Sequence, residues 1–288
     1  MNASVSVRRL ALLLLPVLLA AGCAQSPGER KGTVQRMYVL NCGESRTTDV
    51  SRWSPGVNVG QPWEFSNNCY LIRHGKDWML WDTGFSDAVA AMPDGLVAAG
   101  GALRARLPKT LVSQLAEIGV KPGDITYIAF SHFHADHAGN ANLFATATVY
   151  IQETEYAALF GPEPQKFGFQ PATYEKLRSS SIMRLKGDHD VFGDGSVVIL
   201  STPGHTPGHQ SLLVRLQKTG VVILSGDLTH FQSNWDNRRV PGMNFNADQT
   251  KSSMDKVAAL IVTEKAQFWI NHDKAQSAKM PRPPAYLD

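Results

Sequence analysis

Residues 131–139 read Ser-His-Phe-His-Ala-Asp-His-Ala-Gly and directly follow the apolar run ITYIAF at 125–130, which predicts a strand. The first two histidines alternate with Phe133, so both side chains project to one side of an extended chain. The aspartate and the third histidine follow where the chain turns. Buried imidazoles need hydrogen-bond partners, so this density is unusual for packing. It is typical of a divalent metal site, because imidazole and carboxylate are zinc ligands.

Three later apolar runs also end in residues of the metal-ligand type. The run SVVILS precedes Thr-Pro-Gly-His-Thr-Pro-Gly-His at 202–209, GVVIL precedes Ser-Gly-Asp at 225–227, and FWI precedes Asn-His-Asp at 271–273. Proline and glycine restrict the turn that carries His205, so little entropy is lost in presenting its side chain. The alternative is a set of surface histidines and turn aspartates. Four strands ending this way favour one shared site.

The remaining pattern is mixed α/β. Leu111, Leu115 and Ile118 share a helical face within 109–118, and a second helix is predicted over 249–264 with Asp248 as its N-cap. Short turns at Asp194-Gly195 and Thr219-Gly220 predict antiparallel strand pairs. We predict one domain, with strands in the runs RMYVL, NCYLIRH, WMLWD, ITYIAF, ATVYI, SVVIL, QSLLVRL, GVVILS and FWI.

These motifs resemble the metallo-β-lactamase superfamily, whose signature is H-x-H-x-D-H followed by a spaced His, Asp and His. The resemblance covers nearly all of residues 36–288, including Asp82-Thr83-Gly84. It implies an α/β fold, the αββα four-layer sandwich, with two divalent metal ions between the sheets and zinc as the default ion. By motif position, the implied ligands are His132, His134 and His205 for one ion, Asp136, His137 and His272 for the other, and Asp227 as a bridge; Asp82 and His209 would orient ligands.

Within this superfamily the chain is most similar to the N-acyl-homoserine lactonases, which share the T-P-G-H-T-P-G-H-Q-S of residues 202–211. That branch commonly has tyrosine three residues after the bridging aspartate, where this chain has His230. The resemblance implies that a metal-bridging hydroxide opens a lactone or cleaves a related carboxylic ester. Asp227 would relay a proton to the leaving alkoxide, His230 would contact the carbonyl, and Asp136 would complete the catalytic set.

Two other functions stay open on the sequence. A β-lactam or phosphoester hydrolase can share this fold. A non-catalytic envelope lipoprotein could keep metal for structure, although a purely structural role does not require an open dinuclear centre. True zinc β-lactamases usually lack the full set that includes Asp136 and Asp227, which disfavours that activity.

Apolar side chains near the motifs predict a small, hydrophobic substrate. The alternative for each of them is an ordinary place in the core. The candidates are Trp53, Trp63 and Phe65, expected in a loop beside the site, and Phe133, Trp235, Met243 and Phe245, close in sequence to the ligand residues.

The N-terminus reads as an export signal of the bacterial lipoprotein type. Arg8 and Arg9 precede an uncharged run of 12 residues, Leu10 to Ala21, which is shorter than the ~20 that span a bilayer as a helix. We predict a signal peptide over 1–22, lipid on Cys23, a tether over 23–35 and a catalytic domain over 36–288 at the periplasmic face of a membrane. Plain secretory cleavage, giving a periplasmic or secreted protein, is the alternative.

Charge and cysteine content limit partners and compartment. The net charge is +3, and removing Arg8 and Arg9 leaves +3 − 2 = +1, so a nucleic-acid partner is not expected. Of the 3 cysteines, Cys42 and Cys69 remain after lipidation of Cys23. They form either a disulfide, which an exported protein can keep, or two buried free thiols.

Overall fold

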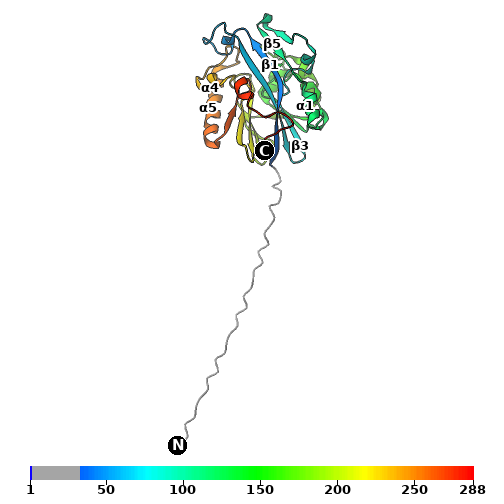
Figure 1. The fold of residues 1–288 in the computed structure, drawn as a ribbon, viewed down its shortest axis with the longest axis vertical. Coiled ribbons are helices and arrows are strands. Elements are labelled where there is room, and N and C mark those ends of the chain that lie inside the picture. Colours follow the sequence, from blue (N-terminus) through cyan, green and yellow to red (C-terminus); the bar gives the residue numbers. More distant parts are fainter. Residues whose placement is uncertain (2–32) are drawn as a thin grey trace. The chain divides into compact units, whose positions relative to one another are not determined.

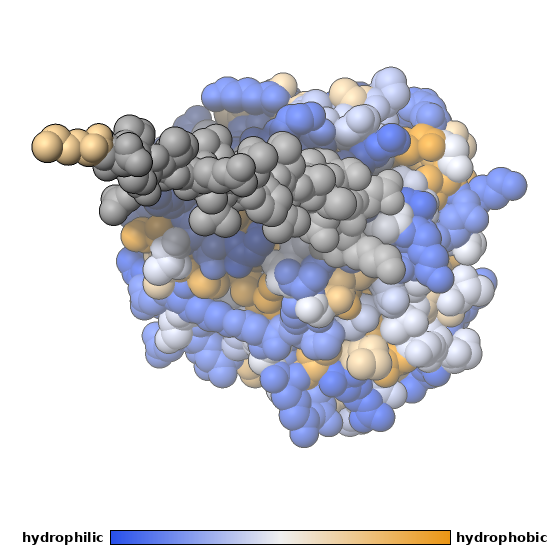
Figure 2. Space-filling model, turned by 90° about the horizontal axis from the view of Figure 1, so that it is seen from below, coloured by the Kyte–Doolittle hydropathy of each residue, from blue (hydrophilic) through white to orange (hydrophobic). Residues whose placement is uncertain are grey.

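The structure, a computed structural model, describes residue 1 and residues 33–288 (Figure 1). The predicted signal peptide, Cys23 and most of the predicted tether lie outside the described residues and stay predictions. Among the residues that are described, no helix is long and apolar enough to cross a membrane. Figure 2 shows that hydrophilic and hydrophobic residues are interspersed on the face seen from below, as on ordinary protein surfaces.

A mixed sheet organises the described part of the chain, and each of the nine predicted strands is present in it. Its strand order is β13-β12-β11-β1-β2-β3-β6-β7-β8, with β10 paired to β11 and β9, and β5 paired to β1 and β4. β1 and β11 meet parallel at a single pair, Val34 and Leu216, so the sheet folds there into two halves. The bounds are β1 Val34–Thr47, β2 Trp63–His74, β3 Asp77–Trp81, β4 Leu96–Ala98, β5 Leu103–Arg106, β6 Tyr127–Ala129, β7 Thr148–Gln152, β8 Ile182–Leu185, β9 His189–Asp190, β10 Val197–Ser201, β11 Gln210–Leu216, β12 Gly220–Leu224 and β13 Gln267–Trp269.

Alternation of side chains along the strands divides the core into layers. Met37 of β1 and Val214 of β11 are buried in one cluster between the two halves. Leu40 of β1 faces the opposite way, into a cluster with Leu111 and Leu115 of α1. The helices that cover the two outer faces are α1 Leu111–Glu117 and α2 Glu153–Phe160 on the first half and α5 Ala247–Glu264 on the second. The predicted αββα sandwich is confirmed.

The second predicted helix begins two residues earlier than expected. Asn246, and not Asp248, is the N-cap of α5, because its side chain accepts a hydrogen bond from the amide of Gln249. Asp248 lies in the first turn, where its negative charge interacts favourably with the positive end of the helix dipole. The shorter helices are α3 Pro171–Tyr174, α4 Gln232–Asp236 and α6 Lys274–Ser277.

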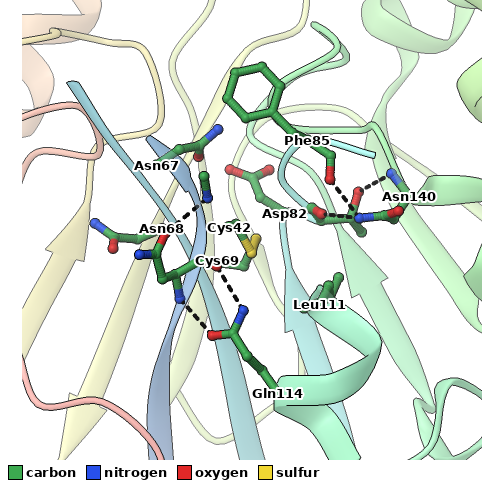
Figure 3. Close-up of a disulfide and its surroundings, with 12 residues drawn as sticks. Cys42, Asn67, Asn68, Cys69, Asp82, Phe85, Leu111, Gln114 and Asn140 are labelled. Atoms are coloured by element: carbon green, nitrogen blue, oxygen red, sulfur yellow. Dashed lines mark hydrogen bonds between the residues drawn. A yellow bond between two sulfur atoms is a disulfide. The ribbon is translucent and has the colours of Figure 1, made fainter. Parts of the chain in front are cut away.

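Strands β1 and β2 are longer than the apolar sequence runs RMYVL and NCYLIRH from which they were predicted. Trp63 and Phe65 belong to β2, so the prediction that they lie in a loop was wrong. The β4–β5 hairpin, which the sequence did not reveal, pairs with the extended end of β1. Cys42 and Cys69 form a disulfide between β1 and β2 (Figure 3).

Candidate metal centre

All seven predicted ligand residues come together at one edge of the sandwich. The H-x-H-x-D-H segment follows β6, His205 lies in the turn between β10 and β11, Asp227 follows β12, and His272 follows β13. Each half of the folded sheet therefore contributes. The four groupings of possible ligand atoms within 4.8 Å of one another are His132/His134/His205, His132/His137/Asp227, Asp136/His137/His272 and His205/Asp227/His230.

The first group of ligand atoms consists of three imidazole nitrogens. His134 Nδ1 lies 2.9 Å from His132 Nε2 and 3.1 Å from His205 Nε2. Asp227 Oδ2 lies 3.3 Å from His205 Nε2 and 3.8 Å from His132 Nε2. We call His132, His134 and His205 the first ligand group.

The second ligand group is Asp136, His137 and His272. Asp136 Oδ2 lies 3.7 Å from the Nε2 atom of each of the two histidines, and those two atoms are 3.3 Å apart. Asp227 Oδ1 lies 3.2 Å from His137 Nε2 and 3.0 Å from His272 Nε2. The two oxygens of Asp227 thus face different ligand groups.

The outward nitrogen of each imidazole has an oxygen partner. His134 Nε2 lies 2.9 Å from the carbonyl oxygen of Phe167, and His272 Nδ1 lies 2.8 Å from that of Ser66. His205 Nδ1 lies 2.9 Å from Asn244 Oδ1. In a neutral ring, donation to such an oxygen leaves the inward nitrogen without a proton and free to bind a metal.

The electrostatics of the site fit a bound cation. Burial lowers the pKa of His132 and of His205 well below the usual value, so both rings are neutral. Burial alone would raise the pKa of Asp227, yet His272 and His137 hold it well below its usual value. Asp227 Oδ1 is buried and has no hydrogen-bond partner. Burial alone would lower the pKa of His137 and of His272, yet Asp227 raises both above their usual value. The buried, ionised carboxylate of Asp227 thus draws positive charge to the site, and divalent ions can supply that charge in place of the protons on these rings.

Two orienting residues hold the ligands in place. Asp82 accepts from the amide of Ser131 at 2.6 Å and lies 3.0 Å from His137 Nδ1. His209 Nε2 accepts from the amide of Asp227 at 2.9 Å. Burial lowers the pKa of His209 to about 4, so it is neutral and can accept. The geometry agrees with the orienting roles predicted for both.

Comparison with known proteins agrees with this geometry. Residues 62–262 match the family model described as the metallo-beta-lactamase superfamily. The chain belongs to the metallo-β-lactamase superfamily. It is 31% identical over 265 residues to an N-acyl homoserine lactonase of Bacillus cereus, covering 88% of this chain and 100% of that protein. It is 30% identical over 262 residues to the N-acyl homoserine lactonase AttM of Azorhizobium caulinodans, covering 88% and 98%.

A similar solved structure contains a bound product. It is an N-acyl homoserine lactone hydrolase with N-hexanoyl-L-homoserine at its catalytic metal centre. This chain superimposes on it with a TM-score of 0.76 at 28% identity, over 88% of this chain and 99% of the other.

Glu155 supports the turn at residues 202–209 that carries His205, and no feature of the sequence indicated this role for Glu155. It is buried on α2, accepting from Thr206 Oγ1 at 2.9 Å and from the amide of Gly208 at 2.8 Å. Burial raises its pKa to about 7. A lone acid in a short helix has no motif, so only the fold reveals that it holds the turn carrying His205.

Three asparagines form a second support that the sequence did not reveal. Asn67 Nδ2 donates to the carbonyl of Asp136 at 2.5 Å, and Asn271 Nδ2 donates to Asn67 Oδ1 at 3.1 Å. The amide of Asn68 donates to Asn271 Oδ1 at 3.0 Å. The adjacent pair Asn67 and Asn68 at the start of an apolar strand could have indicated such a network, because buried side-chain amides require hydrogen-bond partners.

His230 lies inside the site. Its Nε2 atom is 3.1 Å from Asp227 Oδ2, its ring stacks on His272 at 5.3 Å, and its Nδ1 atom is buried without a partner. His230 also lines the cavity beside the first ligand group, together with His134 and His205.

A cavity of about 240 Å³ opens beside the two ligand groups, with an apolar wall. Trp53, Phe65 and Met243 line it, as predicted. Phe133 and Trp235 do not: Phe133 packs on Phe130, and Trp235 packs on Phe268. Trp63 and Phe245 are exposed outside the lining, at 41% and 52%. The apolar residues that the sequence did not reveal in the lining are Phe85, Leu96, Ala98, Leu103, Ala105 and Ala135.

Proposed function

We propose that this chain is a metal-dependent hydrolase that opens N-acyl-homoserine lactones. The observation that carries the proposal is the Asp227 carboxylate set between two ligand groups beside an apolar cavity. Relatives that are about 30% identical to this chain, and whose length is covered almost completely, are named N-acyl homoserine lactonases. This similarity supports the same substrate class here.

The residues present fit two divalent ions, for which zinc is the ordinary choice. The first ligand group would hold one, the second ligand group the other, and Asp227 would contact both. When bound, such ions polarise a carbonyl oxygen and lower the pKa of a water molecule.

The chain's own residues bind and orient the substrate. The apolar wall contacts the acyl chain and excludes water from it. Hydrolysis adds the water oxygen to the carbonyl carbon and breaks the ring carbon–oxygen bond, and the leaving alkoxide takes up the proton that water loses. Asp227 Oδ2 accepts that proton and passes it to the alkoxide. His230, whose Nε2 atom lies 3.1 Å from Asp227 Oδ2, donates a hydrogen bond to the carbonyl oxygen of the substrate.

A substrate panel on metal-loaded protein tests the proposal. We expect turnover of N-acyl-homoserine lactones, with weaker turnover of esters and little of β-lactams or phosphodiesters. Asp227→Asn should lower kcat/KM at least about 100-fold, since it removes charge and proton acceptor together. Absence of lactone turnover with two ions bound would contradict the proposal, and turnover of another class in the panel would replace it.

We also propose export and lipidation at Cys23. The short apolar run after Arg8 and Arg9 supports export, and so does the Cys42–Cys69 disulfide, because disulfides persist in oxidising compartments. Mass analysis of the mature N-terminus tests it. An unmodified cysteine there would contradict lipidation, and an intact residue 1 would contradict cleavage.

A further inference from the structure

The Cys42–Cys69 disulfide crosses an interruption in the β1–β2 ladder. Asn41 pairs with Asn68 and Gly43 pairs with Asn67, so Cys42 is an extra residue without a cross-strand partner. Gln114 of α1 binds the neighbouring backbone instead: its Oε1 accepts from the amide of Asn41 at 2.9 Å, and its Nε2 donates to that residue's carbonyl at 2.7 Å (Figure 3). The covalent bond therefore joins the two strands where their hydrogen bonding is irregular.

On one side, Cys42 supports the segment that holds His137. A Cβ atom on Gly84 would lie 2.3 Å from Cys42 Cβ, so the Asp82-Thr83-Gly84 segment packs directly on the cysteine. The amide of Thr83 donates to the carbonyl of His137 at 2.7 Å, and Asp82 Oδ2 lies 3.0 Å from His137 Nδ1.

On the other side, Cys69 lies two and three residues after Asn67 and Ser66, which hold Asp136 and His272. Ser66 accepts from His272 Nδ1 at 2.8 Å through its carbonyl, and Asn67 donates to the carbonyl of Asp136 at 2.5 Å. All three members of the second ligand group thus depend on segments that flank the disulfide.

The first ligand group is held mainly by other parts of the fold. His134 lies against the carbonyl of Phe167 and His205 against the side chain of Asn244, both remote in sequence from the cysteines. His132 contacts Ser131, which also contacts Asp82 and His137, so this serine supports a residue of each group.

We infer that the Cys42–Cys69 disulfide positions the second ligand group, so that oxidation of this pair sets whether the centre binds one metal ion or two. The inference rests on the proposed dinuclear site. A phosphine supplies two electrons that break the S–S bond, and one water molecule supplies two protons and an oxygen atom, so the products are two thiols and the phosphine oxide. The strands can then separate at the irregular position, and Asp136, His137 and His272 lose their fixed spacing.

Metal titration of the whole chain tests the inference without measuring turnover. Wild-type protein is prepared in two forms: oxidised, or reduced by a phosphine, alkylated and freed of reagent. Each form is titrated with Co²⁺ in competition with a chelator, and the visible spectrum of bound Co²⁺ reports each equivalent. The Cys42→Ala/Cys69→Ala variant is treated in the same way. We expect the first equivalent to keep its affinity and the second to bind roughly 10–100-fold more weakly, as when residues that orient ligands are removed.

Two further variants separate positioning from general stability. Val39→Ala removes a buried side chain of β1 that faces the other core, so it should lower the Tm while both equivalents bind as in wild type. Asn67→Ala keeps the disulfide but removes the contact to Asp136, so it should weaken the second equivalent alone. Unchanged binding after reduction, or parallel loss of both equivalents, would overturn the inference. Oxidised wild type that binds fewer than two ions would contradict the proposed dinuclear function first, and this inference with it.

Discussion

His230 occupies the position where the resemblance to lactonases implies a tyrosine, and it is buried against Asp227 and His272. An imidazole there can donate a hydrogen bond as a tyrosine hydroxyl does. We expect His230→Ala to lower kcat/KM about 10–100-fold while both metal equivalents remain, and His230→Tyr to recover most of the loss. Steady-state kinetics together with metal analysis measure this.

His74→Ala is the matched control for that comparison. His74 bonds to Asp194 at 2.8 Å and stacks on Phe192, away from the two ligand groups, so its removal should leave kcat/KM unchanged. Equal kinetics for His230→Ala and wild type would exclude His230 from the reaction.

Glu155 predicts a pH effect on stability. Burial raises the pKa of Glu155 in the folded chain to about 7 from its ordinary value of 4.5, so the folded state binds the proton more tightly than the unfolded state. The stabilisation is fully present below about pH 4.5 and is lost as the pH rises through about 7, a change of roughly 3 kcal/mol. Glu155→Gln cannot ionise. The difference obtained by subtracting the wild-type Tm from the Tm of this variant should therefore increase between about pH 5 and about pH 8. Scanning calorimetry measures both Tm values.

Asp188→Asn provides the control, because Asp188 is an exposed carboxylate outside the site that pairs with Lys256. Its Tm difference from wild type should not rise over the same pH interval. A flat difference for Glu155→Gln would show that Glu155 does not bind its proton more tightly in the folded chain.

Among the elements, those with strong apolar runs were predictable and those built by pairing were not. β6, β11 and β12 are buried strands, and their composition identifies them. β4 has 3 residues and β5 has 4, with Gly100 and Gly101 between them, so neither gives a periodic signal. They form because β5 pairs with the end of β1 and β4 then pairs with β5. The ligands were predictable because their residue types are rare at strand ends, whereas Glu155 and Asn67 act through contacts that only the fold creates.

The β4–β5 hairpin makes a prediction about substrate size. Ala98 and Ala105 line the cavity with small side chains, whereas Val97 points outward and is 46% exposed. Ala105→Trp should fill the acyl side of the cavity, raising KM for long-chain lactones at least about tenfold while short-chain lactones are little affected. A series of lactones of increasing acyl length measures this.

Val97→Trp is the control on the outer face of the same hairpin and should leave the chain-length profile unchanged. If Ala105→Trp reduced turnover of every lactone equally, the hairpin would not contact the acyl chain.

Over the whole molecule, each ligand group takes side chains from both halves of the folded sheet. His132, His134, Asp136 and His137 follow β6 in the first half, and His205, Asp227 and His272 follow strands of the second. Between those halves lie the buried cluster around Met37 and Val214 and the single β1–β11 pair. Bound ions would therefore link the halves at the edge where the ligand groups meet.

Metal removal should consequently destabilise the entire fold. An ion at 100 times its Kd stabilises the folded state by about 2.7 kcal/mol, and each kcal/mol shifts the Tm of a chain this long by roughly 2–4 °C. We expect chelation to lower the Tm by at least about 5 °C per ion lost, and zinc to restore it. In the His134→Ala variant the first ligand group is incomplete, so chelation should produce about half the wild-type shift. An equal Tm with and without chelator, at confirmed metal loss, would mean that the core between the halves suffices and that the ions serve the reaction alone.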